Sequence, residues 1–173
     1  MKKIFMTLAA TVMAMTINAQ AFIGGGVGVV NTDNGDNDVT TFKFVPEVGY
    51  VFNDDWAAGV AFGWQGADKG HAKEWTINPY VRYTFLNGKL VSAFLDGCIG
   101  YGHVYNAGND TDELSFGIKP GLAIKLNNRV SFVTHIGFVG YNHEKDNNTD
   151  NKIDSWGLSL DGNNIVFGLY YNF

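Results

Sequence analysis

The chain has 173 residues, a formal net charge of −5, 22 glycines, one cysteine and many aromatic residues, namely 13 Phe, 8 Tyr and 4 Trp. This length suits a single domain, and one cysteine excludes a framework of internal disulfides. The sequence contains no basic tract, so we expect no nucleic-acid partner. Beyond the N-terminal segment, no apolar run approaches the roughly 20 residues of a membrane-spanning helix.

Residues 1–21 have the order of a secretory signal peptide. Lys2 and Lys3 form a short basic start, residues 4–17 are mostly apolar, and the segment closes with small residues. This order predicts export with cleavage after Ala19 or Ala21, of which the A-x-A rule favours Ala21. A retained N-terminal helix is the alternative. Removal of both lysines leaves 10 basic against 17 acidic residues, a net charge of −7.

From residue 22 onward, apolar residues alternate with small or polar residues at a period of two. Trp56, Phe62 and Trp64 share one face of a segment whose opposite face carries only Ala, Gly and Gln. Such alternation predicts β-strands. In chain order the predicted strands are 22–31, 39–52, 56–65, 75–85, 91–104, 114–126, 130–141 and 165–173. This even count allows an antiparallel barrel with both termini at one end.

The predicted connections alternate between short and long. The short turns are 53–55, 86–90 and 127–129. The long connections are mostly polar and comprise 32–38, 66–74, 105–113 and 142–163. Short turns at one rim and long loops at the other are typical of outer-membrane barrels, in which the long loops are extracellular.

The charged strand residues predict which way the barrel faces. Glu47, Arg82, Asp96 and Lys119 all fall on the glycine-rich face, whereas the opposite face is a band of apolar and aromatic residues. A charge near the membrane midplane costs about 2–4 kcal/mol, so the uncharged face is expected to meet lipid. Trp56 and Trp64 would then stand about 20 Å apart along the membrane normal, close to the separation of two aromatic girdles. A secreted soluble barrel is the alternative.

Three prolines occupy matching positions in the second, fourth and sixth predicted strands. Pro46, Pro79 and Pro120 each lie six residues before the last apolar residue of their strand, on its outward face. The shared pattern indicates an internal hairpin repeat. Because proline cannot donate to a ladder, we expect a bulge or a missing ladder bond at that depth.

The segments 46–50, 79–83 and 167–173 resemble the small outer-membrane β-barrel domain family of Gram-negative bacteria, which is similar to the transmembrane domain of outer-membrane protein A. The resemblance covers residues 22–173 and implies an all-β, eight-stranded antiparallel up-and-down transmembrane β-barrel in the cell outer membrane. It also implies that the last strand is the signal read by the barrel-assembly machinery. The residues that match this signal are Phe167, Leu169, Tyr171 and Phe173.

The inward charges are the first candidates for chemistry. An eight-stranded barrel has an interior that side chains fill, so buried charges there must be paired. We therefore predict a network of Arg82, Asp96 and Lys119, with Glu47 as a further member. It is interpreted as a stabilising plug, with a gated ion or proton path as the alternative.

We expect no cofactor, no metal site and no enzymatic activity. Residues 146–154 carry oxygen ligands at alternating positions, but Asn151 and Gly157 stand where a calcium loop has its glycine and its glutamate. Residues 33–38 are similarly incomplete. His135 is followed by Gly137, where the outer-membrane lipid A deacylases would place a serine. Cys98 falls on the inward face and is interpreted as a packing residue.

The sequence thus predicts a monomeric outer-membrane barrel with a structural, envelope-integrity or adhesive role. Its expected partners are outer-membrane lipid, the barrel-assembly machinery, and an extracellular ligand or protein that contacts the long loops. The alternative is a narrow porin-like channel for ions or small solutes, and a further one is a secreted soluble barrel that carries an apolar ligand.

Overall fold

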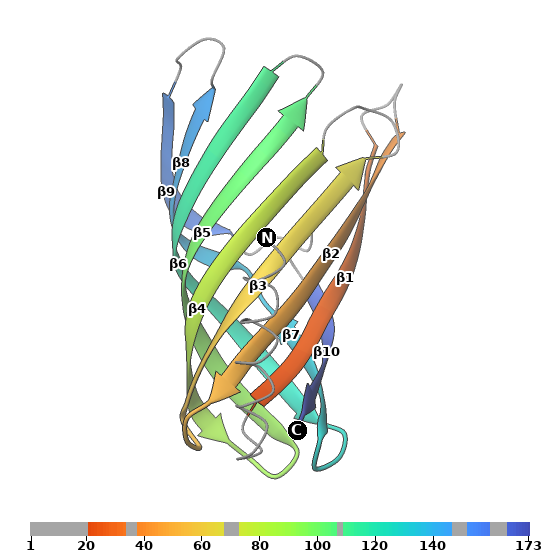
Figure 1. Cartoon of the computed structure of the whole chain (residues 1–173), viewed down its shortest axis with the longest axis vertical. Helices are drawn as coiled ribbons and strands as arrows, with labels where there is room; N and C mark the ends of the chain where they lie inside the picture. Colours follow the sequence, from red (N-terminus) through yellow and green to blue (C-terminus); the bar gives the residue numbers. More distant parts are fainter. Residues whose placement is uncertain (1–20, 34–37, 68–72, 107–108, 147–151, 160–165) are drawn as a thin grey trace, which may run out of the picture.

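The computed structural model describes residues 21–33, 38–67, 73–106, 109–146, 152–159 and 166–173 (Figure 1). The predicted signal peptide lies outside these residues, except for Ala21. Within these ranges, no helix has the length and apolar character needed to cross a membrane.

The described chain is built from β-strands. They are β1 (Ala21–Asp33), β2 (Asp38–Val51), β3 (Trp56–Ala67), β4 (Lys73–Asn87), β5 (Val91–Asn106), β6 (Asn109–Lys125), β7 (Val130–His135), β8 (Phe138–Asp146), β9 (Lys152–Ser159) and β10 (Val166–Asn172). All of their pairings are antiparallel.

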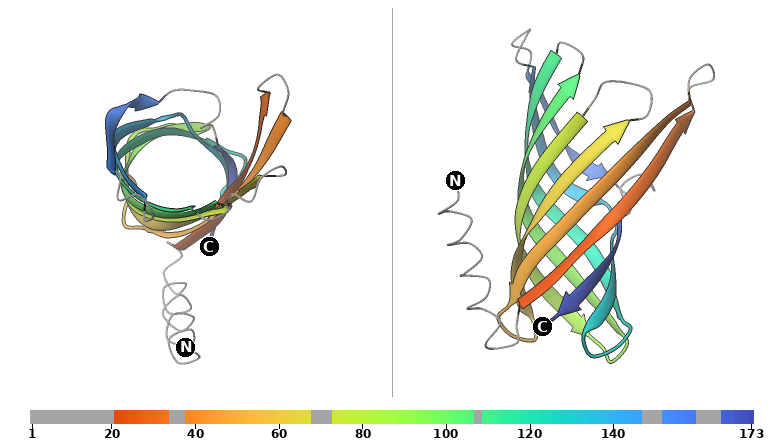
Figure 2. Two further views of the ribbon diagram at one scale, coloured as in Figure 1. Left: turned by 90° about the horizontal axis from the view of Figure 1, so that it is seen from above. Right: turned by 45° about the vertical axis from the view of Figure 1, so that its right-hand side comes forward.

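These segments occupy eight positions around a barrel, which confirms the predicted fold class. Both β7 and β8 pair with β6 and follow one another along it, so together they form the seventh position. In the same way β10 pairs with β7 and β9 pairs with β8, and together they form the eighth. The barrel closes where β1 pairs with β10 between Phe22 and Val27. Figure 2 shows the closed ring from above.

The strands are longer than the sequence analysis predicted, so the expected extracellular loops are wrong in extent. The largest difference lies in residues 142–163, where β8 runs on to Asp146 and pairs with β9. The hairpins of β1–β2, β3–β4 and β5–β6 likewise extend into residues 32–38, 66–74 and 105–113. Polar side chains are compatible with strands above the membrane, where both faces meet water.

The two ends of the barrel differ in how completely its strands are paired. At the end of the short turns, which we call the lower end, β1 is paired on both sides. At the opposite, upper end, β1 continues from Gly28 to Asp33 with β2 as its partner. No pairing joins this part of β1 to β9 among the described residues. Seen from above, the β1–β2 hairpin splays away from β8 and β9 (Figure 2).

Short turns hold the lower end together through asparagine side chains. Asn53 Oδ1 accepts hydrogen bonds from the backbone N–H groups of Asp55 at 3.0 Å and Trp56 at 2.9 Å. Asn127 Oδ1 accepts the equivalent pair from Arg129 and Val130, each at 2.8 Å. An asparagine that bonds its own following backbone stabilises a tight turn.

The prolines interrupt the ladder as their chemistry requires. The β2–β3 pairing skips Val45 and Pro46, and the β4–β5 pairing skips Asn78 and Pro79. At Pro120 the ladder contains a bulge, because the two residues of β6 between Ile118 and Gly121 face the three residues between His135 and Val139. Gly137 in this bulge has a φ of 80°, a left-handed conformation that favours glycine.

Packing inside the barrel differs from bottom to top. The lower interior is filled by apolar side chains, including the buried Phe22, Phe94, Val133 and Tyr170. The outer face carries exposed apolar residues instead, such as Phe44, Phe62 and Ile99. A soluble barrel would carry polar residues on its outer face, whereas this apolar outer face suits a surface that meets lipid.

Candidate functional site

An ion pair joins two neighbouring strands inside the barrel, above the apolar lower core. Arg82 on β4 stands opposite Asp96 on β5. Arg82 Nε donates to Asp96 Oδ1 at 2.7 Å and Nη2 donates to Oδ2 at 2.8 Å, so the pair is bidentate. Both residues are buried, with exposed fractions of 8% and 2%. Removing one partner of such a buried pair strongly destabilises the protein, because the other charge is left buried and unpaired.

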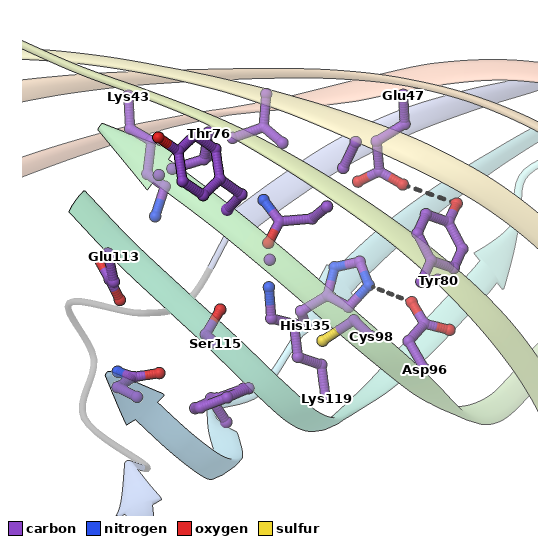
Figure 3. A pocket seen from close by; sticks show the side chains of 18 of the residues that line it. Lys43, Glu47, Thr76, Tyr80, Asp96, Cys98, Glu113, Ser115, Lys119 and His135 are labelled. Atoms are coloured by element: carbon purple, nitrogen blue, oxygen red, sulfur yellow. Dashed lines mark hydrogen bonds and ion pairs between the residues drawn. The ribbon is translucent and has the colours of Figure 1, made fainter. Parts of the chain in front are cut away.

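His135, at the end of β7, is the second partner of the Asp96 carboxylate. Its Nε2 lies 2.9 Å from Asp96 Oδ2 (Figure 3). The Phe94 ring contacts both neighbours of this carboxylate: it packs edge-on against the His135 ring, and the Arg82 guanidinium lies 3.9 Å from its centroid. Arg82 is therefore held by charge on one side and by an aromatic face on the other.

Glu47 on β2 and the two tyrosines that bind it form the second half of this layer. We call the whole set, with Arg82, Asp96 and His135, the ion layer. Tyr80 donates its hydroxyl hydrogen to Glu47 Oε2 at 2.9 Å (Figure 3), and Tyr170 donates to the same oxygen. The Arg82 guanidinium lies 5.2 Å from the Tyr80 ring centroid and 5.4 Å from that of Tyr170. The two tyrosines thus lie between the carboxylate of Glu47 and the guanidinium of Arg82.

The structure brings together three of the four residues expected in the interior network. Lys119 is the exception. Its position on β6 is directly opposite Asp96, yet its ammonium lies 5.8 Å from the Phe138 ring centroid. Asp96 forms its salt bridges with Arg82 and His135, and no salt bridge between Asp96 and Lys119 forms among the described residues. The expected inclusion of Lys119 in the network is therefore corrected.

A polar cavity of about 290 Å³ lies above the ion layer. Its floor includes Glu47, Asp96 and His135, and Lys43 and Lys119 point into it (Figure 3). Higher in the cavity the walls are polar, formed by residues that include Thr76, Asn78, Glu113, Ser115 and Asn142. Asn142 Oδ1 is buried and has no hydrogen-bond partner within the described part of the chain. The cavity can therefore accept a hydrogen-bond donor from water or from a polar ligand.

Three residues of the ion layer escaped the sequence analysis. Tyr80 and Tyr170 looked like ordinary inward aromatic residues, and His135 was considered only for an enzymatic motif. Strand alternation shows that each of these three side chains faces inward. Whether they come together depends on the height of each residue in the barrel, and their strands are far apart in sequence. A search for inward polar side chains at equal height would have found them.

The sequence analysis considered three further candidates for chemistry. Cys98 faces inward, and its sulfur lies 3.6 Å from the Gly117 carbonyl oxygen. The calcium-like segment 146–154 falls largely outside the described residues, as does most of 33–38. Over the described ranges, no group of three or more His, Cys, Asp or Glu residues is arranged to hold a metal ion.

The last strand alternates as expected at the sequence level. The apolar side chains of Phe167, Leu169, Tyr171 and Phe173 are exposed on the outer face, whereas Tyr170 faces inward. The Phe173 N–H donates to the Ala21 carbonyl at 3.0 Å, which ties the end of the last strand to the start of the first at the lower end of the barrel.

Residues 4–173 match the outer membrane protein beta-barrel domain family, and the chain belongs to this family. The protein is therefore an outer-membrane β-barrel located in the cell outer membrane. No curated protein sequence matches the chain.

Solved structures of small outer-membrane barrels share the fold. Neisserial surface protein A (NspA) superposes with a TM-score of 0.57 at 16% identity, covering 88% of this chain and 97% of that chain. The outer membrane protein OprG from Pseudomonas aeruginosa also gives 0.57, at 14% identity, covering 90% of this chain and 96% of that chain. At such identities the likeness concerns the fold alone.

Proposed function

We propose that this protein is a non-enzymatic, monomeric surface protein that presents its upper end to extracellular partners. The observation that carries this proposal is the division of the interior. Apolar packing and the ion layer fill the barrel below, whereas the polar cavity lies above them. Such an arrangement suits a stable support for contacts at the upper end, with adhesion or envelope integrity as the role.

The proposal includes the route by which the protein reaches the membrane. Residues 1–21 act as a cleavable export signal, and the outward residues of β10 with Phe173 act as the signal for the barrel-assembly machinery. Alternation of apolar residues up to a terminal aromatic side chain supports this role. Truncation of Phe173 should reduce the outer-membrane amount of the protein without changing its export to the periplasm.

A narrow channel is the second candidate function. The charged side chains that line the cavity, among them Lys43, Glu113 and Lys119, favour it because they would hold water and ions. Conduction would require the ion layer of Arg82, Asp96 and His135 to open.

Planar bilayer recordings separate the two functions. We expect no stable conductance steps from the purified protein, under conditions in which a general porin conducts. Reproducible single-channel steps that change when Lys119 is replaced by glutamate would instead establish the channel.

Adhesion is tested on cells that display the protein. We expect binding to host cells or extracellular matrix above that of cells without it. Trimming the hairpin tips one at a time to short Gly-Ser turns should abolish binding in at least one variant that still folds. Equal binding by cells with and without the protein would contradict the adhesive role.

A further inference from the structure

Two lysines point into the polar cavity above the ion layer, Lys43 from β2 and Lys119 from β6 (Figure 3). The pairings of β2 with β3, β3 with β4, β4 with β5 and β5 with β6 carry the chain halfway around the barrel, so the two side chains enter the cavity from opposite walls. They are close enough for their charges to repel each other. Neither ammonium forms a hydrogen bond or a salt bridge to any residue that the structure describes. We call Lys43 and Lys119 the cationic pair.

The carboxylates in the floor of the cavity have other partners. Asp96 forms its salt bridges within the ion layer, and Glu47 accepts hydrogen bonds from the two tyrosines of that layer. The floor therefore supplies no direct partner to the cationic pair. A charge held inside a protein is costly unless it is paired or hydrated, so these two ammonium groups are available to a solute that enters the cavity.

A group of carboxylates faces the cavity from the side of the upper end. Glu113 on β6 lines the cavity and stands directly opposite Glu144 on β8. Glu74 on β4 is the third member, which accepts a hydrogen bond from Gln65 at 3.1 Å and repels Glu113. Like charges that face each other across a ladder destabilise it. Within the described ranges, none of the three forms a salt bridge, and they are not arranged to hold a metal ion. We call them the acidic group.

The cationic pair and the acidic group are separated along the barrel axis. On β6, the backbone of Glu113 is about 15 Å above that of Lys119 along the membrane normal, at about 3.3 Å per residue and a tilt near 40°. The acidic group attracts Lys43 across the gap, but at distances longer than a salt bridge. Asn142 on β8 lies at a height between them, with its buried Oδ1 still able to accept a hydrogen bond. From bottom to top, the cavity thus offers two cations, one acceptor and then carboxylates.

We propose that this cavity binds a small polar zwitterion, a solute of amino-acid size that carries one carboxylate and one ammonium. The carboxylate lies between Lys43 and Lys119, the ammonium lies beneath Glu113, and a hydrogen-bond donor of the solute reaches Asn142 Oδ1. A zwitterion neutralises the cationic pair and the acidic group together, whereas a simple anion or cation meets like charge at one end. The site does not depend on the adhesive role of the upper end.

The size and the walls of the cavity agree with such a solute. A volume of about 290 Å³ is at the small end of the range of ligand pockets. Thr76, Asn78 and Ser115 make the walls polar, which favours a hydrophilic solute over an apolar one. The ion layer lies below, so the solute is held in the cavity without passing through the barrel.

NMR titration of the isotope-labelled protein in detergent micelles tests the site, with serine as the probe. Two analogues each lack one charge: 3-hydroxypropionate has no ammonium, and ethanolamine has no carboxylate. We expect serine to shift the backbone amide signals of Gly102 and Ser115 in a saturable manner. Each analogue should bind roughly tenfold more weakly, because it leaves charged groups of the site unpaired. Equal affinities for the three compounds, or no saturable shift with serine, would overturn the proposal.

Variants that remove one charge identify the contacts. Lys43→Met and Lys119→Met should each weaken the binding of serine about fivefold or more, without weakening that of ethanolamine. Glu113→Gln should weaken the binding of serine and make 3-hydroxypropionate the better ligand. A variant that merely disturbs the barrel would weaken all three compounds alike, so the change of preference reports a contact with the ligand.

Two exposed residues in the lower turns provide the charge controls. Lys89→Met and Asp54→Asn should bind serine as the wild-type protein does. An unchanged affinity for serine in all three cavity variants would contradict the proposed site. A loss of affinity without any change of preference among the three compounds would contradict it as well, because the charges would then act on the barrel and not on the solute.

Discussion

Asp96 stands directly opposite Lys119 across the β5–β6 ladder, yet both of its carboxylate oxygens are engaged by Arg82 and His135 instead. The bidentate fork of arginine matches a carboxylate better than the single ammonium of lysine does. Lys119 remains in the cavity above, near Phe138. Lys119 therefore belongs to the cavity and Arg82 to the ion layer on its floor, and replacing these two residues should have different effects.

Replacement of Arg82 by alanine should destabilise the barrel by about 3–5 kcal/mol, because it leaves the buried Asp96 without its main partner. Urea titration of the protein in lipid vesicles measures this loss. The folded fraction at each urea concentration is read from the shift between unboiled and boiled samples on a denaturing gel. Lys119→Ala is the control on the adjoining strand and should change the unfolding free energy by less than a third as much. An equal loss from both variants would contradict the separation of layer and cavity.

Glu47 depends on two tyrosine hydroxyls. Tyr170→Phe removes one donor from a carboxylate that is 5% exposed, so we expect a loss of about 1–3 kcal/mol in unfolding free energy. Tyr80→Phe should act in the same way, and the double variant should lose more than either. Tyr171→Phe, one residue along and facing outward, is the control, and its loss should stay below 1 kcal/mol by the same titration. Equal losses from Tyr170→Phe and Tyr171→Phe would contradict this role of Glu47.

The alternation of apolar and polar residues was sufficient to predict most of the strands, their inward and outward faces and the three short turns, but not the break between β7 and β8. It is a local signal and persists wherever one face meets lipid. In residues 142–146 and 152–155, which lie above Tyr141 and Trp156, both faces meet water, so the signal is weaker, and β9 was not among the predicted strands. Within β9, the alternation remains visible at Trp156 and Leu158, which share one face with Gly157 between them.

The candidate site was predicted only in part, because its members come from different strands. Arg82 and Asp96 are on neighbouring strands, so their pairing follows from the register. Tyr170 on β10 and Glu47 on β2 both stand opposite Gly24 of β1, so their meeting depends on the closure of the barrel between its first and last strands. Lys119 was assigned by adjacency alone, and competition for the oxygens of Asp96 decided its place.

Asp154 on β9 lies on the water side of the outward aromatic pair Tyr141 and Trp156, and its carboxyl should titrate abnormally. Hydrogen bonds from Tyr141 at 2.6 Å and from His143 at 2.5 Å hold the pKa of its carboxyl below its usual value. A lowered pKa means that these bonds favour the folded hairpin above the usual carboxyl pKa. Their contribution is lost as the pH falls through the lowered value.

Carbon-detected NMR titration of Asp154 in detergent micelles measures this effect. Tyr141→Phe removes the larger contribution and should raise the pKa of Asp154 toward that of a free aspartate. Tyr83→Phe, in the lower aromatic girdle, should leave it unchanged. A wild-type pKa equal to that of an aspartate in a short peptide would disprove the hydrogen-bonded arrangement.

Gly137 allows the bulge opposite Pro120 through a conformation that other residues rarely adopt. With a φ of 80°, alanine at this position should destabilise the barrel by about 1–2 kcal/mol. The bulge also positions His135, because the Ile136 N–H donates to the Pro120 carbonyl at 2.8 Å directly after it. Gly137→Ala should therefore weaken the contact between His135 and Asp96 as well, visible as a changed chemical shift of the imidazole.

Gly157→Ala is the matched control, since a Cβ atom there meets nothing within 4 Å. It should leave both the midpoint of the unboiled-to-boiled gel transition and the His135 resonance where they are in the wild-type protein. If Gly137→Ala shifted neither, then the left-handed conformation would not be required. The bulge at Pro120 would then owe its geometry to the proline alone, since proline has no N–H to donate to the ladder.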